Sequence, residues 1–450
     1  MPASTDGTSF TDWLRSHATP LSHLDPSAPL DDLEPLRDIL DGARVVALGE
    51  HSHFIDEFAA MRQRLLRFLV ERCGFTVLAF EYGFCEAIPL DTWAHGTGAD
   101  DDLSALLATA VPIGLQDPLR FIRRHNRTTA EPVRFAGIDI PAAGGSLLPA
   151  LDPVADYLRR IDPETLPTVR SATTIAASFA GDSAAVAAPA WARLATTDQD
   201  TLSALLARLL IRFRSLEPLY VSRGDRPSYD TALRCLEAAC HGDYTFRAMA
   251  ALFAGEGLTA DTSARDLYMA ESLLWHLDRL EPTARVVLMA HNAHIQREPI
   301  AFDGHLTGLP MGQHLHHALG DAYFALGLTG VTGHTADMRR DESAPFGFTV
   351  HDTPLEPPVP GSIEAAFAGA GLGLAVADLR QARAEDLGAP DRIRIQGTYQ
   401  HTPVIDAFDG ILSTPASTTS DLEKPPPPRS AEVPVPPVRH RNNRGQTPRP

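Results

Sequence analysis

Five short apolar segments constrain the fold of this chain more than any other feature of its sequence. Each has the length of a β-strand, and segments with helical periodicity alternate with them. Near-continuous apolarity is typical of strands that are buried on both faces, as in a parallel sheet. The segments predicted to form strands are residues 45–48, 76–80, 133–140, 286–290 and 323–328.

The stretch between the first two segments has the periodicity of a helix with one apolar face. Its apolar residues recur mostly at spacings of three and four, and they are Phe58, Met61, Leu65, Phe68 and Leu69. A strand, a helix and a second strand in this order form the repeating unit of α/β proteins. We therefore predict an α/β fold in which helices flank a mainly parallel sheet core.

Residues 145–280 have a different pattern. Helical periodicity covers residues 184–216, 228–254 and 263–280, and no convincing strand lies between these stretches. We predict a helical insertion subdomain at about residues 145–280, placed within one α/β domain that spans residues 1–416.

The last segment of the chain differs in composition from everything before it. Residues 417–450 hold nine of the 37 prolines, together with six basic and three acidic residues. A segment with little hydrophobicity and this much proline cannot bury enough apolar surface to fold. We therefore predict a disordered proline-rich tail over residues 417–450.

The composition excludes several kinds of partner. With 57 acidic and 39 basic residues, the formal net charge is -18 at pH 7, and such a balance repels the phosphate backbone of nucleic acids. No apolar run is long enough to span a membrane, the N-terminus lacks the pattern of a secretory signal, and four cysteines are too few for a disulfide scaffold. We expect a cytoplasmic protein with no nucleic acid or membrane partner. The sequence leaves its oligomeric state open.

Ionisable side chains follow four of the predicted strands. The carboxyl ends of parallel strands meet at one edge of a sheet, where α/β proteins bind their ligands. We therefore predict a functional site at this edge. The ionisable residues near these strand ends are Glu50, His51, His53, Glu81, Asp139, His291 and His294.

Histidines close to glutamates suit the activation of a water molecule. A neutral imidazole with an ordinary pKa of about 6.5 takes a proton from water at neutral pH. A carboxylate bonded to the other ring nitrogen fixes the tautomer and stabilises the imidazolium. The chain has no GxSxG motif, so a serine nucleophile on a strand-to-helix elbow is not supported.

The same side chains include types that bind zinc or iron. However, the pairs His51 with His53 and His291 with His294 do not have the HExxH spacing of a metalloprotease. Each of these histidines, taken alone, could equally be a structural residue near a strand end. We expect neither a metal nor another cofactor.

Two motifs, GExxH and HNxH, follow the first and the fourth predicted strand in this order. They lie in the segments ALGEHSHFIDEF and VVLMAHNAHIQRE, and two later segments are MGQHLHHALGDAYFALGLTGVTG and HTPVIDAFDGILSTPAST. With these segments the chain resembles the erythromycin esterase family over roughly residues 30–416. The two motifs together are more specific than either alone.

The resemblance implies a metal-independent hydrolase that opens the macrolactone ring of erythromycin-type antibiotics with an activated water molecule. It implies His53 as the general base. The positions that match the family pattern are Glu50, His53, Arg62, Glu81, His291 and His294. The chain departs from the pattern at Phe54, where a small residue is usual, and at His51, which is an additional histidine. The resemblance therefore supports the reaction type more than the substrate.

We predict a carboxylic ester hydrolase that acts on an ester or lactone of a bulky, hydrophobic natural product. His53 deprotonates water, Glu50 or Glu81 orients it, and the developing oxyanion is stabilised by donors that include His291. The residues predicted to support the site or to bind substrate are Arg62, which also acts on the oxyanion, His294, His51 and Asp139.

Two alternatives keep the fold and change the function. One is a biosynthetic tailoring enzyme that catalyses cyclisation, elimination or acyl transfer at the same site. The other is a non-catalytic protein that binds a ligand or haem. The sequence does not decide between a role in antibiotic resistance and one in biosynthesis.

Overall fold

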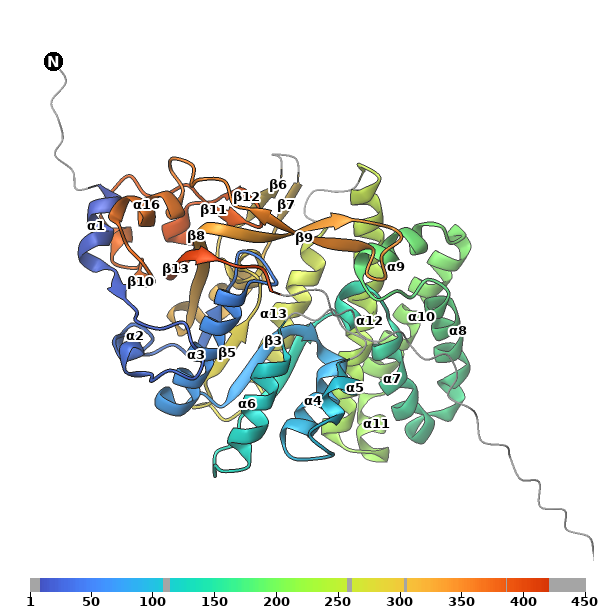
Figure 1. Ribbon diagram of the computed structural model, residues 1–450. Coiled ribbons are helices and arrows are strands. Elements are labelled where there is room, and N and C mark those ends of the chain that lie inside the picture. The colour runs from blue at the N-terminus through green and yellow to red at the C-terminus, as the bar shows by residue number, and fades with distance from the viewer. Residues whose placement is uncertain (1–8, 108–113, 257–260, 303–305, 386, 421–450) are drawn as a thin grey trace, which may run out of the picture. The chain divides into compact units, whose positions relative to one another are not determined.

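The computed structural model describes residues 9–107, 114–256, 261–302, 306–385 and 387–420. Within these ranges a nine-stranded sheet forms the centre of the protein (Figure 1), in the order β1-β10-β13-β8-β2-β5-β3-β4, with β9 pairing the far end of β8. The strands of this sheet are β1 (Thr19–Pro20), β2 (Val45–Leu48), β3 (Val77–Gly83), β4 (Arg134–Asp139), β5 (Val286–Met289), β8 (Tyr323–Arg340), β9 (Phe348–Pro354), β10 (Ala375–Asp378) and β13 (Gly410–Ser417).

The pairing confirms the predicted mainly parallel core. The six strands β4, β3, β5, β2, β8 and β13 pair with their neighbours in parallel, whereas β10 and β1 join the edge antiparallel. All five predicted strands are present. Two small antiparallel pairs lie apart from this sheet, namely β6 (Ile300–Phe302) with β7 (Leu306–Gly308), and β11 (Arg392–Ile395) with β12 (Thr398–His401).

Helices cover both faces of the sheet, because each strand of its centre is apolar on both sides. One apolar core lies between the sheet and a first group of helices, α2 (Pro35–Ile39), α3 (Asp56–Cys73), α4 (Phe84–Ala94), α5 (Asp102–Leu106) and α6 (Gln116–Asn126). A second core lies under the other group, α1 (Phe10–His17), α13 (Ser263–Leu277), α14 (Asn292–Ile295), α15 (Met311–Leu319), α16 (Ile363–Ala370) and α17 (Val404–Ala407).

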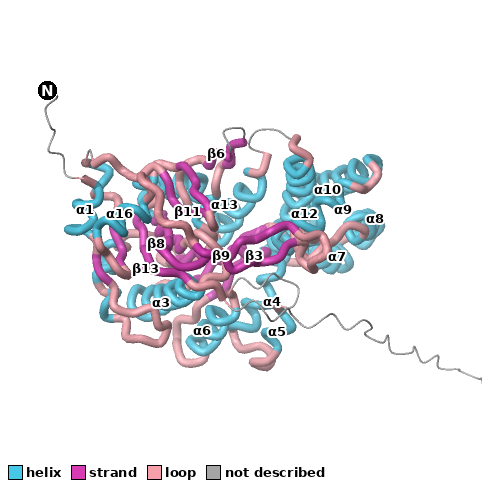
Figure 2. Tube along the Cα trace, turned by 45° about the horizontal axis from the view of Figure 1, so that its top comes forward, coloured by secondary structure: helices cyan, strands magenta, loops and turns pink. Residues whose placement is uncertain are grey.

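Helices also fill the described part of residues 145–280, with no strand there. They pack around a third apolar core beside the sheet (Figure 2), which α4 and α13 share through Phe84 and Tyr268. The described residues up to Ser420 belong to one compact unit. The helices that precede α13 in this region are α7 (Leu148–Ile161), α8 (Leu166–Ala177), α9 (Ala184–Ala192), α10 (Thr196–Ser215), α11 (Glu217–Arg223) and α12 (Arg226–Phe253).

Strand β8 is much longer than predicted. The sequence pattern ends at residue 328, but the strand continues to Arg340 and turns back as β9. The extension consists mostly of small and polar residues, so it carries no apolar run. Main-chain pairing holds it instead, with β13 as far as Gly333 and with β9 from His334 onward. The hairpin reaches the helical region, where the Ser183 hydroxyl donates to the Phe346 carbonyl at 2.6 Å.

The compact unit extends four residues beyond the predicted boundary at residue 416, to Ser420. Strand β13 ends at Ser417, and the three residues after it contact the start of α3. The Thr418 N–H donates to Glu57 at 2.7 Å, and the Ser420 N–H donates to the Phe54 carbonyl at 2.8 Å. These polar residues carry no apolar signal, so only their hydrogen bonds show that they belong to the domain. The rest of the predicted tail, residues 421–450, lies outside the described residues.

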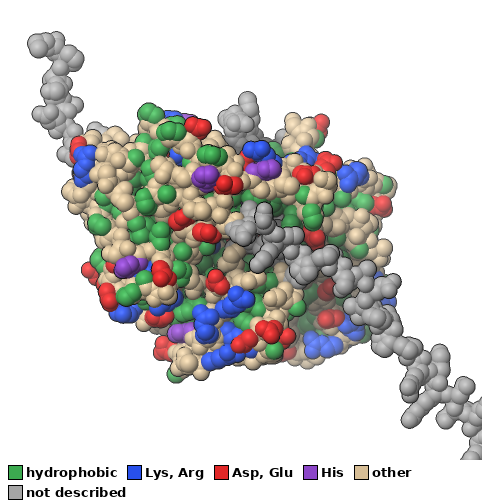
Figure 3. Space-filling view, in the orientation of Figure 1, with side chains coloured by type: hydrophobic (Ala, Val, Ile, Leu, Met, Phe, Trp, Pro, Cys, Tyr) green, Lys and Arg blue, Asp and Glu red, His purple; other side chains and the backbone are tan. Residues whose placement is uncertain are grey.

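None of the described helices combines the length and the apolarity that a membrane crossing requires. On the face shown in Figure 3, acidic and basic side chains gather together over the region of α4 to α6. Asp100 accepts from both Arg123, at 2.7 Å, and Arg127, at 2.5 Å. Asp100 therefore offsets part of the positive charge of Arg123 in α6 and of Arg127, which follows this helix.

Candidate active site

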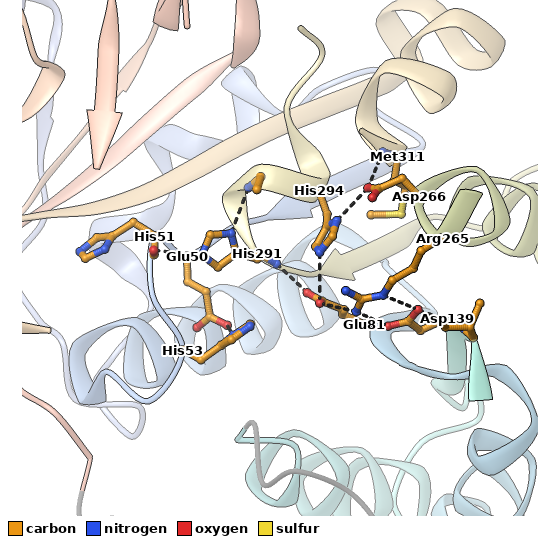
Figure 4. A network of polar contacts seen from close by, with 12 residues as sticks. Glu50, His51, His53, Glu81, Asp139, Arg265, Asp266, His291, His294 and Met311 are labelled. Atoms are coloured by element: carbon orange, nitrogen blue, oxygen red, sulfur yellow. Dashed lines mark hydrogen bonds and ion pairs between the residues drawn. The ribbon is translucent and has the colours of Figure 1, made fainter. Parts of the chain in front are cut away.

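The strand order explains how residues far apart in the sequence meet at the carboxyl edge of the sheet. Strand β5 lies between β2 and β3. The turn after β5, which begins at His291, therefore lies between Glu50, which follows β2, and Glu81, which lies near the end of β3. Figure 4 shows the two carboxylates on either side of this turn. The predicted convergence of these strand ends is confirmed.

Position 49 of the GExxH motif must be glycine because the side chain of Asn292, from the HNxH motif, packs directly against it. The Asn292 amide donates to the Leu328 carbonyl at 2.9 Å and accepts from the Leu328 N–H at 3.2 Å. A Cβ atom at Gly49 would lie 1.9 Å from the Asn292 Oδ1 atom. Any larger residue would displace this side chain, so the two motifs are coupled by packing as well as by chemistry.

Glu50, His53 and Arg62 form the first charged cluster of the site. The Glu50 Oε1 atom lies 2.8 Å from His53 Nδ1 and 2.7 Å from an Arg62 nitrogen. Burial alone would raise the pKa of Glu50, but the charge of Arg62 and the hydrogen bond from His53 lower it to about 2. Glu50 is therefore an ionised acceptor, so the His53 Nδ1 atom carries a proton and the neutral ring keeps its lone pair on Nε2.

Two features prepare His53 to exchange a proton with solvent. Its side chain is 19% exposed, in contrast to the buried Glu50. Burial lowers the pKa of His53, but the hydrogen bond and the charge of Glu50 outweigh this effect, so the pKa lies above its ordinary value. The next residue, Phe54, has a φ of 61°. This left-handed conformation is costly for a bulky residue.

Glu81 lies at the centre of a second charged cluster. Its Oε2 atom accepts the His291 N–H at 2.9 Å, and its Oε1 atom accepts from Arg265 at 3.0 Å. Arg265 also binds Asp139, with nitrogen–oxygen distances of 2.5 and 3.0 Å. Burial opposes ionisation, but His294 and then Arg265 hold the pKa of Glu81 well below its ordinary range. Asp139 is fully buried, so it anchors Arg265 and does not face solvent.

His294 lies between two carboxylates in this second cluster. Its Nδ1 atom is 2.7 Å from Asp266 Oδ1, and its Nε2 atom is 3.4 Å from Glu81 Oε1. Burial disfavours the charged ring, but Asp266 and Glu81 together raise its pKa to about 10. His294 is therefore an imidazolium at neutral pH and cannot accept a proton there.

The two remaining histidines have neutral rings. The His291 Nδ1 atom accepts the Ala293 N–H at 3.1 Å, and its Nε2 atom donates to the His51 carbonyl at 2.9 Å. Burial, followed by the charge of His53, lowers the pKa of His291 to about 4. His51 is fully buried, and its ring packs edge-on against the Phe58 ring, with 4.9 Å between the ring centroids. This burial lowers the pKa of His51 to about 3. Its ring points away from His53 (Figure 4).

Sequence reasoning missed Arg265 and Asp266, which lie side by side in the first turn of α13. Acidic residues are common in the first turn of any helix because they favour the helix dipole, so Asp266 carries no special signal. Arg265 is one of many arginines. Their position between the helical region and the sheet edge becomes visible only when the chain is folded. Within the described residues, no three His, Cys, Asp or Glu side chains converge as a metal site requires.

Histidine–carboxylate clusters thus lie at the carboxyl edge of a mainly parallel sheet, which is where α/β enzymes bind their ligands. Comparison with known proteins identifies the family. The Erythromycin esterase family matches residues 70–417. The chain therefore belongs to the erythromycin esterase family, which confirms the resemblance in the sequence and makes the protein a hydrolase of the esterase type.

The relatives are similar along nearly their full length. The chain is 37% identical to erythromycin esterase type II of Escherichia coli over 414 residues, which are 92% of this chain and 99% of the relative. It is 30% identical to erythromycin esterase type I of Escherichia coli over 396 residues, 87% and 95% of the two chains. A solved structure of a mutant of the erythromycin esterase EreC, in its open conformation, matches with a TM-score of 0.81 and 28% identity. It covers 89% of this chain and 97% of that one.

Proposed function

We propose that the protein hydrolyses the lactone ester of a macrolide, with His53 as the general base that activates water. The observation that carries the proposal is the 2.8 Å contact between Glu50 and the Nδ1 atom of a partly exposed His53. It leaves Nε2 as the atom that can take a proton. The similarity to two erythromycin esterases over almost the whole chain supports the macrolide as the substrate class.

In the first step, His53 Nε2 takes a proton from water while the new hydroxide attacks the ester carbonyl carbon. The imidazolium that forms is stabilised by Glu50, whose ionised carboxylate accepts the Nδ1–H. Arg62 is 6% exposed, binds Glu50 at 2.7 Å and lies 5.4 Å above the Phe80 ring. We therefore assign Arg62 to holding Glu50 ionised rather than to the oxyanion.

The tetrahedral intermediate needs a donor for its negative oxygen. His291 does not serve in this conformation, because both of its ring nitrogens are bound to main-chain groups. His294 is the better candidate, since it is charged, its side chain is 17% exposed and its Nε2–H is held only loosely by Glu81, at 3.4 Å. A donor of this kind is typically worth about 3–4 kcal/mol in the transition state.

The intermediate then collapses. The carbon–oxygen bond to the leaving alkoxide breaks, and the proton that His53 took from water passes to that alkoxide. The products are a carboxylate and a hydroxyl on one opened ring, and His53 returns to its neutral form. The overall change is the addition of one water molecule.

Incubation with a panel of macrolides and other lactones, followed by mass spectrometry, tests this function. We expect a gain of one water on at least one macrolide, and the same rate after treatment with a chelator. A product that has lost one water would instead support cyclisation or elimination. No turnover of any macrolide, or activity that disappears with the chelator and returns with one metal, would contradict the proposal.

A further inference from the structure

We propose that Asp266 is a positioning residue that fixes the His294 ring for the hydrolysis proposed above. This inference rests on that proposed function and adds a residue that neither sequence motif contains. It follows from the contacts that Asp266 makes with two neighbouring elements.

One oxygen of Asp266 joins three parts of the fold. Asp266 lies in the first turn of α13, and its Oδ1 atom accepts from His294 Nδ1 of α14 at 2.7 Å and from the Met311 N–H of α15 at 2.9 Å. Two donors on one oxygen fix the position of the carboxylate. The rotation of the His294 ring is then set, because its Nδ1–H has one partner and its Nε2 must face Glu81.

Charged side chains from two neighbouring elements, α13 and β3, face His294. Asp266 faces it from α13 and Glu81 from β3, while the neutral His291 lies at the start of its own helix. Arg265 stands behind Glu81, at 3.0 Å. Two negative groups thus face one imidazole, and Arg265 is already bound to Glu81 and Asp139. This arrangement keeps His294 charged.

Without Asp266, two properties of the site change together. His294 loses the closer of its two carboxylates, at 2.7 Å against 3.4 Å for Glu81, and its pKa falls toward the ordinary value of about 6.5. Its ring is also free to rotate, so Glu81 loses a fixed neighbour. The electrophile of the proposed mechanism is then neutral over part of the working pH range.

The test combines a direct measurement on His294 with an activity profile. In histidine-labelled protein, NMR should show that His294 titrates with a midpoint near 10, well above that of an ordinary histidine. Asp266→Asn keeps the shape of the side chain and an acceptor for Met311, and it should lower this midpoint by two units or more. It should also lower kcat about 10-fold or more, since removal of an oxyanion donor costs about 100-fold or more, while KM changes little.

The pH profile separates positioning from mere structure. In Asp266→Asn, kcat/KM should fall at alkaline pH with the new His294 midpoint, and Asp266→Glu should restore the alkaline activity in part. The matched control is Ser263→Ala, which removes a 2.8 Å hydrogen bond from the Leu309 N–H to the same helical turn without touching His294. This control should leave the His294 midpoint and the profile unchanged.

A midpoint near 6.5 for His294 in the unmodified protein would overturn the inference, and this result does not depend on whether any variant folds. An unchanged midpoint in Asp266→Asn would also overturn it. Because the NMR titration needs no substrate, it remains decisive if no macrolide is hydrolysed, so failure of the proposed function and failure of this inference can be told apart.

Discussion

The two histidine clusters at the sheet edge contain the same types of side chain but differ in how many carboxylates each histidine contacts. His53 contacts one carboxylate, Glu50, and leaves its other ring nitrogen toward solvent. His294 faces two carboxylates, Asp266 and Glu81, one at each ring nitrogen. One carboxylate raises a histidine pKa moderately and fixes the tautomer, whereas two keep the ring protonated through neutral pH.

This difference divides the chemistry between the clusters. A general base must lose and regain a proton near neutral pH, and only the first cluster allows it. In the proposed mechanism the oxyanion is stabilised by a donor that stays charged, and His294 of the second cluster is that donor. The HNxH turn lies between the two clusters, and the main-chain contacts of His291 keep that turn in place.

Removal of the base should have the largest effect. His53→Ala should lower kcat about 100-fold to 10,000-fold, the usual contribution of general base catalysis, with little change in KM. The fold should persist, because this partly exposed ring packs against few neighbours. Steady-state kinetics and circular dichroism measure the two effects.

His51→Ala is the matched control for that experiment. Its ring is fully buried against Phe58, so the change should lower stability through the cavity it leaves, and it should lower kcat far less than His53→Ala. Normal turnover in His53→Ala combined with none in His51→Ala would place the base two residues earlier in the chain.

The loss of Arg265 from the second cluster should lower the free energy of unfolding more than it lowers the activity of the base, His53. Arg265→Gln leaves the fully buried Asp139 without its counter-charge and leaves Glu81 with His294 as its remaining charged partner. Breaking a buried ion pair costs about 3–5 kcal/mol, and since Arg265 is 26% exposed we expect about 2 kcal/mol. Denaturant unfolding measures this loss, and a stability equal to that of the unmodified protein would show that the cluster does not hold β3 and β4 to α13.

Truncation of the chain before Ser417 should have the smallest effect on stability. Of the two clusters, only the first, which contains His53, lies next to the contacts that are lost. A chain that ends at Ala416 loses the contacts of residues 418–420 with Phe54 and with Glu57 in α3, next to His53. The removed residues make several hydrogen bonds, but those of residues 418–420 are exposed and therefore weak. We expect a loss of about 1 kcal/mol relative to a chain that ends at Ser420. Thermal unfolding of the two truncated chains makes the comparison. Equal melting temperatures would show that residues 417–420 do not stabilise the domain and belong with the tail.

The sheet could be predicted because its central strands are apolar on both faces, as residues 45–48 are. The same reasoning ended β8 too early, since its outer half has no apolar run and is held by pairing with β9. The predicted domain also left out Ser417, because this polar residue at the end of β13 adds nothing to an apolar pattern. Apolar patterns record burial, and they do not record main-chain pairing between polar segments.

The candidate site divides in the same way. The sequence marks His53 and Glu50 as candidates because they lie in the GExxH motif after a strand, and it marks Glu81 because it lies near the end of another strand. The partners that decide their charge could not be predicted. Asp266 and Arg265 come from a helix with an ordinary pattern, and the hydrogen bonds of His291 run to main-chain atoms that no sequence pattern marks.

The pH dependence of kcat/KM in the unmodified protein and in Glu50→Gln tests the division of roles most directly. We predict that activity falls as the pH is lowered through one titration, with a midpoint above 6.5, because His53 must be neutral to act and Glu50 raises its pKa. In Glu50→Gln the maximum rate should be lower, but the midpoint should move to lower pH, since the charge that held the proton is gone. A midpoint that is the same in both proteins would contradict the assignment of His53, held by Glu50, as the base.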